Sequence, residues 1–276
     1  MDAVGSPTIR LERVTSRFGA RCALDGVSTV IAPGQFVAIL GRSGAGKTTL
    51  FRVLAGALPA TEGEVWIGGR CLSALGRAEL RAHRAQVGLV HQQFNLVRRL
   101  RVIDNVLIGR LPHLQAWRRW AALLGRFSPN DRAVALRALH QVGLVDRVWQ
   151  RTDTLSGGEQ QRVAIARILA QEPALILGDE PVASLDPANG ALVMEILARV
   201  AATAGLTVIC TLHQVEYARR YADRVLGLRN GRLVFDGSPG DLSREALRWI
   251  FDAATGGAPA VAAEPPEPSA AASACR

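Results

Sequence analysis

The sequence predicts an α/β fold built on a parallel sheet, and three stretches carry this prediction. Residues 35–40, QFVAIL, form a short apolar run that leads into glycines and then into the helical pattern KTTLFRVLAGAL. Residues 174–180, ALILGDE, and residues 206–213, LTVICTLH, are two further apolar runs typical of buried strands. A helical pattern at 189–204 separates them. Because a helix between two strands crosses over the sheet, we expect these strands to pair in parallel.

The segments around this core differ in composition. TIRLERVTSRF, CALDGVSTVI and EVWIGG mix β-branched and apolar residues with Gly and Asp, which predicts strands in the first part of the chain. Roughly residues 95–170 are rich in helical patterns, with DRAVALRALHQVGL as an amphipathic stretch, and are expected to form a helical insertion in the core. Residues 253–276 are rich in Ala and Pro, and we expect them to be disordered and dispensable.

Charge, hydropathy and cysteine content narrow the functional classes. The net charge of +9 is spread along the chain without a long basic run, so we expect no nucleic-acid partner. No apolar stretch is long enough to cross a bilayer, and MDAVGSPTIRLERV lacks the pattern of a signal peptide. We therefore expect a cytoplasmic protein that another subunit would hold at any membrane. Cys22, Cys71, Cys210 and Cys275 have no zinc-site spacing and are expected to be reduced and mostly buried.

Residues 41–48, GRSGAGKT, fit the phosphate-binding pattern GxxxxGK[ST], the P-loop. Lys47 is the only lysine among 33 Lys and Arg residues. A lysine places a compact charge between terminal phosphates, where the planar fork of an arginine does not fit. Glycines allow the backbone N–H groups to approach the phosphate oxygens. We expect the nucleotide phosphates to contact Gly41, Arg42, Ser43, Gly44, Ala45, Gly46, Lys47, Thr48 and Thr49.

Two carboxylates, Asp179 and Glu180, follow the apolar run of 174–178. Phosphate chemistry needs a metal ion and a water molecule, and a carboxylate can hold the first or polarise the second. Thr48 is expected to offer its hydroxyl to Mg²⁺, and Asp179 is expected to hold the same ion, usually through water. Glu180 is then placed to polarise the attacking water.

The stretch LSGGEQQRVAIARIL, residues 155–169, predicts a second anion-binding helix start. Ser156 is a plausible N-cap, Gly157 and Gly158 leave backbone N–H groups accessible, and Glu159 lies in the first turn. Because the P-loop already supplies one phosphate site, this loop is expected to close on a nucleotide bound by a second copy of the chain.

With the P-loop and LILGDE in this order, LSGGEQ resembles the signature motif of ATP-binding cassette (ABC) ATPases. The resemblance covers about residues 8–245 and implies ATP as the nucleotide. It also implies a P-loop NTPase core of the RecA-like kind, with an N-terminal antiparallel β subdomain and a helical signature subdomain at about 95–170.

The resemblance assigns four further residues. Gln92 in VHQQFNL resembles the glutamine that senses Mg²⁺ and water, and Asp186 in SLD resembles the aspartate that crosses the dimer interface. His213 in TLHQ resembles the switch histidine that contacts the γ-phosphate. Phe18 lies where the family stacks an aromatic ring, usually Tyr, on adenine.

A single cassette with a short helical insertion favours a transporter subunit over the soluble ABC ATPases of repair or translation. The stretches AWRRW, GRFSPNDRA and PVASLDP resemble those of phosphonate import ATP-binding proteins. This implies a homodimer at the cytoplasmic face of a bacterial inner membrane, with permease subunits and, indirectly, a periplasmic solute-binding protein. FNLVRRLRVIDNVL, taken as helical, would receive the permease. Importers of polar amino acids or phosphate, phosphonate-degradation cassettes and soluble ABC ATPases remain alternatives.

Overall fold

The larger of two β-sheets carries the parallel core in this computed structural model, which describes residues 6–123 and 125–252. Within those residues it has six strands in the order β10-β9-β3-β8-β7-β6. All neighbours pair in parallel except β10, which is antiparallel to β9. The strands are β3 (Phe36–Leu40), β6 (Val87–Val90), β7 (Leu175–Asp179), β8 (Thr207–Leu212), β9 (Arg224–Arg229) and β10 (Arg232–Gly237).

The three apolar runs that predicted the parallel sheet are strands β3, β7 and β8. They are neighbours in the sheet, and α7 (Pro187–Ala204) joins β7 to β8. The predicted strand–helix–strand arrangement is therefore confirmed. The Asp186 side chain caps the first turn of α7, and Gly205 ends the helix in a left-handed conformation.

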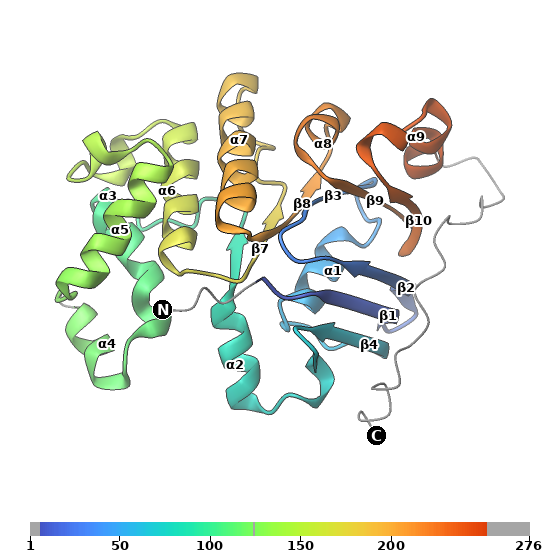
Figure 1. Cartoon of the computed structure of the whole chain (residues 1–276), viewed down its shortest axis with the longest axis horizontal. Coiled ribbons are helices and arrows are strands. Elements are labelled where there is room, and N and C mark those ends of the chain that lie inside the picture. The colour runs from blue at the N-terminus through green and yellow to red at the C-terminus, as the bar shows by residue number, and fades with distance from the viewer. Residues whose placement is uncertain (1–5, 124, 253–276) are drawn as a thin grey trace.

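The N-terminal strands form the smaller sheet, in the order β2-β1-β4-β5 with antiparallel pairing throughout. They are β1 (Ile9–Phe18), β2 (Arg21–Ile31), β4 (Glu62–Ile67) and β5 (Arg70–Cys71). The expected antiparallel β subdomain is confirmed. In Figure 1 these strands lie at one end of the molecule, with α1 (Lys47–Leu54) beside them.

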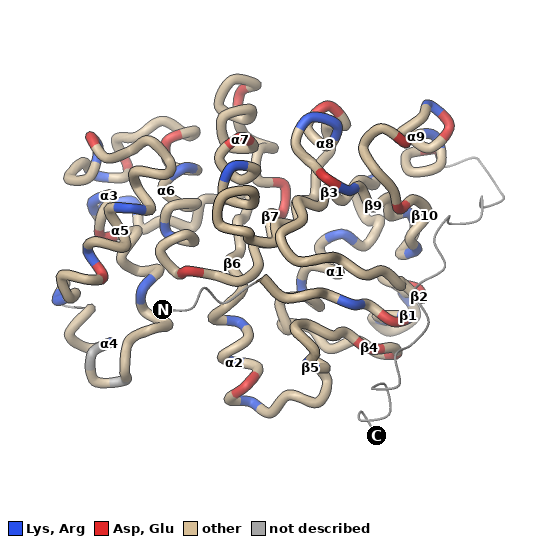
Figure 2. Tube along the Cα trace, in the orientation of Figure 1, with Lys and Arg blue, Asp and Glu red and all other residues tan. Residues whose placement is uncertain are grey.

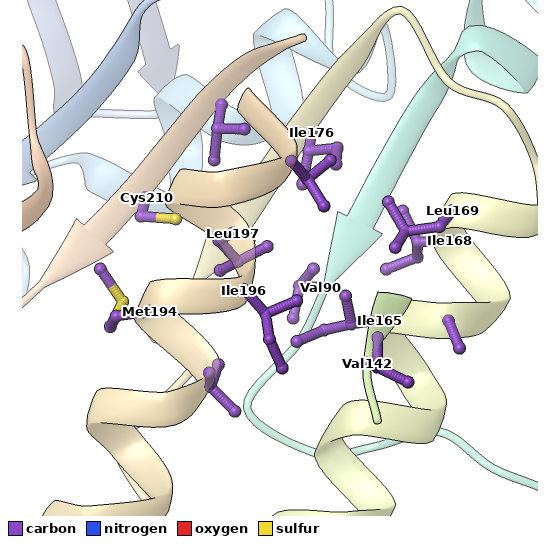
Figure 3. Close-up of a cluster of buried hydrophobic side chains, with 14 of the residues drawn as sticks. Val90, Val142, Ile165, Ile168, Leu169, Ile176, Met194, Ile196, Leu197 and Cys210 are labelled. Carbon is purple, nitrogen blue, oxygen red and sulfur yellow. The ribbon is translucent and has the colours of Figure 1, made fainter. Parts of the chain in front are cut away.

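Both faces of the larger sheet are covered at its central strands β3, β7 and β8, which explains why these strands read as continuous apolar runs. Along β3, Ala38 and Leu40 join the core under α6 and α7, whereas Val37 and Ile39 join the core shared with α1 and the smaller sheet. Figure 3 shows part of the first core, where side chains of α6 and α7 meet residues of β6 and β7. The P-loop helix is thus anchored to the face opposite the signature helix.

A group of helices lies at the other end of the molecule, apart from α1 and the smaller sheet (Figure 1). It contains α3 (Val102–Leu107), α4 (Ala116–Leu123), α5 (Pro129–Gln141) and α6 (Gly157–Ala170). The predicted helical insertion is therefore present, and α3, α5 and α6 pack on one another.

One local prediction was wrong, because residues 94–101 of FNLVRRLRVIDNVL are not helical and α3 begins only at Val102. The buried side chain of Asn105 holds this segment. Its Oδ1 accepts from the Val97 N–H at 2.8 Å, and its Nδ2 donates to the Val97 carbonyl at 3.1 Å and to Thr152 Oγ1 at 2.8 Å. These bonds satisfy backbone groups that a helix would otherwise pair within itself.

The remaining helices are α2 (Arg77–Gln86), α8 (Val215–Tyr221) and α9 (Arg244–Phe251). None of the helices in the described residues combines the length and apolar character needed to cross a membrane. Cys71 and Cys210 are buried and Cys22 is half-buried, all three as free thiols. Cys275 and the predicted disordered segment 253–276 lie outside the described residues.

Candidate functional site

The P-loop between β3 and α1 is packed so closely that two of its glycines are required. Gly46 has φ 106°, and a Cβ atom there would lie 2.5 Å from the Ala23 carbonyl oxygen. Gly41 has φ 156°, and a Cβ atom there would clash with the Leu228 carbonyl oxygen. The loop backbone therefore lies directly against the neighbouring strands.

Lys47, the first residue of α1, turns its ammonium group back toward this loop. Nζ donates hydrogen bonds to the carbonyl oxygens of Gly41 at 2.6 Å and Arg42 at 3.2 Å. Burial lowers the pKa of this ammonium, and the carboxylates of Glu180 and Asp179 offset part of the effect. Since an ammonium has three donors, one remains for a ligand. With no acidic residue in the first turn of α1, the positive helix end also faces the loop uncompensated.

A cavity of about 420 Å³ opens over the P-loop, a size in the range of small-molecule sites. The aromatic ring of Phe18, 44% exposed at the end of β1, lies at this cavity. A base stacked on that ring would therefore share the cavity with phosphates bound at the loop. The lining residues are Phe18, Arg21, Ala23, Arg42, Ser43, Gly44, Gly46, Lys47, Thr48, Thr49, Arg52 and Glu180.

The two carboxylates expected to serve the metal and the water lie at the end of β7 beside this cavity. Asp179 Oδ2 accepts from the Thr48 hydroxyl at 3.2 Å. Glu180 Oε1 lies 2.5 Å from His213 Nε2, in the segment that follows β8. The structure thus brings together four of the predicted residues. A carboxylate in this place can orient and polarise a water molecule for attack on a phosphate.

The donor set around Asp179 fits Mg²⁺. This ion prefers oxygen ligands and commonly takes one or two carboxylates together with substrate phosphates and water. The Thr48 hydroxyl and the Asp179 carboxylate lie within hydrogen-bonding distance of each other, so both could bind one ion. No cluster of three or more His, Cys, Asp or Glu residues suited to a metal occurs in the part of the chain described. An ion held here together with nucleotide phosphates would neutralise phosphate charge.

The predicted N-cap at LSGGEQ is present at the start of α6. The Ser156 hydroxyl accepts from the Glu159 N–H at 3.3 Å, and the Glu159 carboxylate accepts from the Ser156 N–H at 2.9 Å. That backbone bond is the main cause that lowers the pKa of Glu159. At Gly158, a Cβ atom would clash with the side chain of Asn189 in α7. The signature helix and the first turn of α7 are therefore in close contact.

The start of α6 does not reach the cavity of its own chain. The residues that line the cavity come from β1, β2, the P-loop, α1 and Glu180, and none belongs to residues 155–159. Figure 1 shows α6 within the helical group and α1 on the other side of α7. Within a single chain the two predicted phosphate-binding elements are thus separate.

The family model described as ABC transporter matches residues 24–183 of the chain. The chain belongs to this family. It is accordingly an ABC ATPase that binds ATP. A phosphonates import ATP-binding protein PhnC of Rhodopseudomonas palustris strain BisB5 is 49% identical over 242 residues, 88% of each chain. One of Nocardia farcinica is 49% identical over 253 residues, 92% of this chain and 93% of that protein.

Solved ABC cassettes share the fold. The dimeric ATP-binding cassette MJ0796, bound to ADP and phosphate after hydrolysis, is 33% identical with a TM-score of 0.70, covering 84% of this chain and 98% of that one. CbiO1 of Clostridium perfringens, part of the transporter complex cbiONQ, is 27% identical with a TM-score of 0.76, covering 87% and 92%.

Three residues assigned by resemblance, Gln92, Asp186 and His213, are not among the residues that line the cavity, although His213 contacts Glu180 there. Gln92 is exposed on the loop that follows β6, the strand beside β7. Asp186 is exposed at the start of α7, where its carboxylate accepts from the Ala188 and Asn189 N–H groups and from Asn189 Nδ2 at 2.6 Å. The Asn189 side chain is the main cause that lowers the pKa of Asp186. Asp186 thus has a capping role in its own chain, and its role at an interface stays a prediction.

Four residues of the candidate site were missed by sequence reasoning. Arg21, Ala23 and Arg52 line the cavity, and Thr211 in β8 bonds both residues of the carboxylate pair. The alanine and the two arginines left no signal in a chain rich in both residue types. Thr211 did leave one, because a hydroxyl inside the apolar run LTVICTLH must find a partner when buried.

Proposed function

We propose that this ABC ATPase powers the import of phosphonates through a separate membrane permease. The observation that carries the proposal is the agreement of relatives from several genera. Proteins of Rhodopseudomonas, Bradyrhizobium and Nocardia, 46–49% identical over most of the chain, are all named for phosphonate import. The ATP site itself is common to the ABC family and does not discriminate between solutes.

In the proposed mechanism two copies of the cassette, residues 8–245, enclose two ATP molecules. Each ATP lies on the P-loop of one chain and is covered by the capped start of α6 from the other. The support is the separation of the two elements within one chain, together with the dimeric state of a 33% identical cassette. Closure on ATP would move the helical subdomain, at about 95–170, and so transmit force to the permease.

Each site residue then has a defined task. Lys47 would contact the terminal phosphates, and Phe18 would stack on adenine. Thr48, Asp179 and Gln92 would hold Mg²⁺. Glu180 polarises the attacking water. The hydrogen bond between Glu180 and His213 supports a shared role, since the histidine can orient the carboxylate and contact the γ-phosphate. Asp186 would meet the partner chain.

The permease would dock on the segment between β6 and α3, with the cassette held peripherally at the cytoplasmic face of the inner membrane. This segment exposes apolar side chains, Val97 at 49% and Leu100 at 37%, beside the exposed Arg98 and Arg99. An exposed apolar patch with basic neighbours suits a permease helix. Figure 2 shows the other charged positions interspersed over helices and strands, which gives no support to a nucleic-acid surface.

Growth tests the solute. A strain that lacks the gene should fail on a phosphonate as sole phosphorus source and should grow normally on phosphate, or on amino acids as sole nitrogen source. The wild-type gene should restore growth, and Glu180→Gln should not. Normal growth on phosphonate together with failure on an amino acid would refute phosphonate import and leave the ATPase assignment unaffected.

Co-purification tests the docking surface and separates transport from a soluble role. The chain should purify with its permease in detergent and hydrolyse ATP faster in the complex. Leu100→Asp should reduce the recovered permease and leave the ATPase rate of the isolated chain unchanged. Val145→Asp is the matched control, because Val145 is similarly exposed at 44% outside this segment. Recovery with ribosomes or DNA in place of a permease would overturn the transport assignment.

A further inference from the structure

A fully buried threonine in β8 bonds both carboxylate residues of the ATP site. Thr211 is 0% exposed and pairs directly with Asp179 in the parallel register of β7 and β8. Its hydroxyl donates to Asp179 Oδ1 at 3.0 Å and accepts from the backbone N–H of Glu180 at 2.9 Å. One hydroxyl therefore links the residue expected to hold the metal to the residue expected to polarise the water.

The two hydrogen bonds determine which group the Thr211 hydroxyl donates to and which it accepts from. A threonine hydroxyl has a single hydrogen, and here it is given to Asp179, which leaves a lone pair for the Glu180 N–H. Asp179 Oδ2 accepts from the Thr48 hydroxyl on its other side, so the carboxylate plane is defined by one buried contact and one contact at the P-loop. Loss of the buried contact would free the carboxylate to rotate.

The bond to Glu180 has a second effect, because Glu180 adopts the left-handed conformation with φ 52°. Residues with a Cβ atom seldom adopt this conformation. The backbone N–H of Glu180 donates a hydrogen bond to the Thr211 hydroxyl oxygen. The Glu180 carboxylate is hydrogen-bonded to His213, two residues after Thr211. The end of β8 thus fixes both the backbone and the side chain of Glu180.

We propose that Thr211 is a positioning residue for ATP hydrolysis, acting through Asp179 and Glu180 and not by contact with ATP. The inference rests on the proposed roles of those two carboxylates. Thr211 is not among the residues that line the cavity, so we expect it to make no direct contact with the nucleotide. A residue of this kind should affect turnover and leave ATP affinity nearly unchanged.

The test compares substitutions that keep or remove the hydroxyl. Thr211→Val keeps the shape and removes both hydrogen bonds, and kcat should fall about 10- to 100-fold, as is usual when an outer-shell partner of a metal ligand is lost. The ATP dissociation constant, measured with a fluorescent nucleotide in EDTA, should stay close to that of the wild type. Thr211→Ser keeps the hydroxyl and should restore most of the turnover.

Thr207→Val is the matched control within the same strand. Thr207 is also 0% exposed, and its hydroxyl accepts from the Gly34 N–H at 3.0 Å, away from the carboxylates. If Thr211 were merely structural, both valine variants would lower the melting temperature alike and neither would change kcat per folded molecule. That result, or equal losses in Thr211→Val and Thr211→Ser, would overturn the proposal. Thr211→Ala serves as the hydroxyl-free variant should valine prevent folding.

Glu180→Gln, measured in the same assay, distinguishes a failure of the proposed role of Glu180 from a failure of the positioning role of Thr211. Full turnover in Glu180→Gln would show that the water-polarising role is misassigned and would remove the basis of the proposal. Slow turnover in Glu180→Gln with wild-type turnover in Thr211→Val would overturn only the positioning role.

Discussion

Replacing Lys47 by arginine keeps the positive charge and should nevertheless almost abolish ATP hydrolysis. Its Nζ lies 2.6 Å from the Gly41 carbonyl oxygen, and the residue is only 6% exposed, so a larger guanidinium must displace the loop. Overpacking of a buried site costs about 1–3 kcal/mol, which is roughly 5- to 150-fold in binding. The loss of a compact charge on the terminal phosphates in the transition state adds to this. We expect kcat/KM to fall at least about 100-fold.

Phosphate release by the purified chain over a range of Mg-ATP concentrations measures this loss. A thermal melt of each variant shows whether the loop has merely unfolded. Arg77→Lys is the control, since Arg77 is exposed at the start of α2 and the opposite exchange there should be neutral. An arginine variant with the kcat/KM and melting temperature of the wild type would refute the reasoning from space and charge geometry.

Three further changes probe the base, the adenine contact and the helical subdomain. Glu180→Gln should bind ATP, hydrolyse it very slowly and elute as a dimer with Mg-ATP in size-exclusion chromatography; a monomer or full turnover would contradict its role. Phe18→Ala should weaken ATP binding about 2- to 12-fold by titration, and Phe18→Tyr should not, because stacking is worth about 0.5–1.5 kcal/mol. Arg110→Met should lower the free energy of unfolding by about 3–5 kcal/mol in denaturant titrations, because it removes the charged partner at 3.1 Å from the buried Asp131 carboxylate and leaves the hydrogen bonds from Ser128; a loss below about 1 kcal/mol would contradict this. Burial raises the pKa of Asp131, but hydrogen bonds from Ser128 and Arg110 outweigh it and lower the pKa overall. This contribution to stability should therefore be complete above the ordinary carboxyl range and be lost only as the pH falls through the lowered pKa.

The parallel core could be predicted because its signals are local. All five residues of β3 are buried, so the strand reads as an uninterrupted apolar run, and the glycines that follow are needed for the close packing of the loop. Asp179 and Glu180 were found in the same way, since polar residues directly after a buried strand lie at the edge of the sheet where ligands bind.

What the sequence did not predict depends on contacts between distant segments. Residues 94–101 have a helix-like pattern, yet Asn105 ties the backbone of Val97 into a loop and bonds Thr152 across 47 positions. Thr211 meets Asp179 only because β7 and β8 pair in a particular register. Local periodicity does not predict the register of two parallel strands. It also does not predict the partner of a buried polar side chain.

Lys47 is unusual in its residue type and Glu180 in its backbone conformation, and both residues line the same cavity. Lys47 is the only lysine among the 33 Lys and Arg residues of the chain. Glu180 adopts φ 52°, which costs a residue with a Cβ atom about 1–2 kcal/mol. A glycine would remove that cost but would also remove the carboxylate bonded to His213. Strain that a chain retains in this way is typical of functional sites, where surrounding contacts such as the Thr211 hydroxyl hold the residue in place. Arg13, Asn95, Glu172 and Asn230 share the positive φ of Glu180, but of these five residues Glu180 is the one that lines the cavity. There Lys47 would bind the terminal phosphates of ATP, and Glu180 would prepare the water that attacks them.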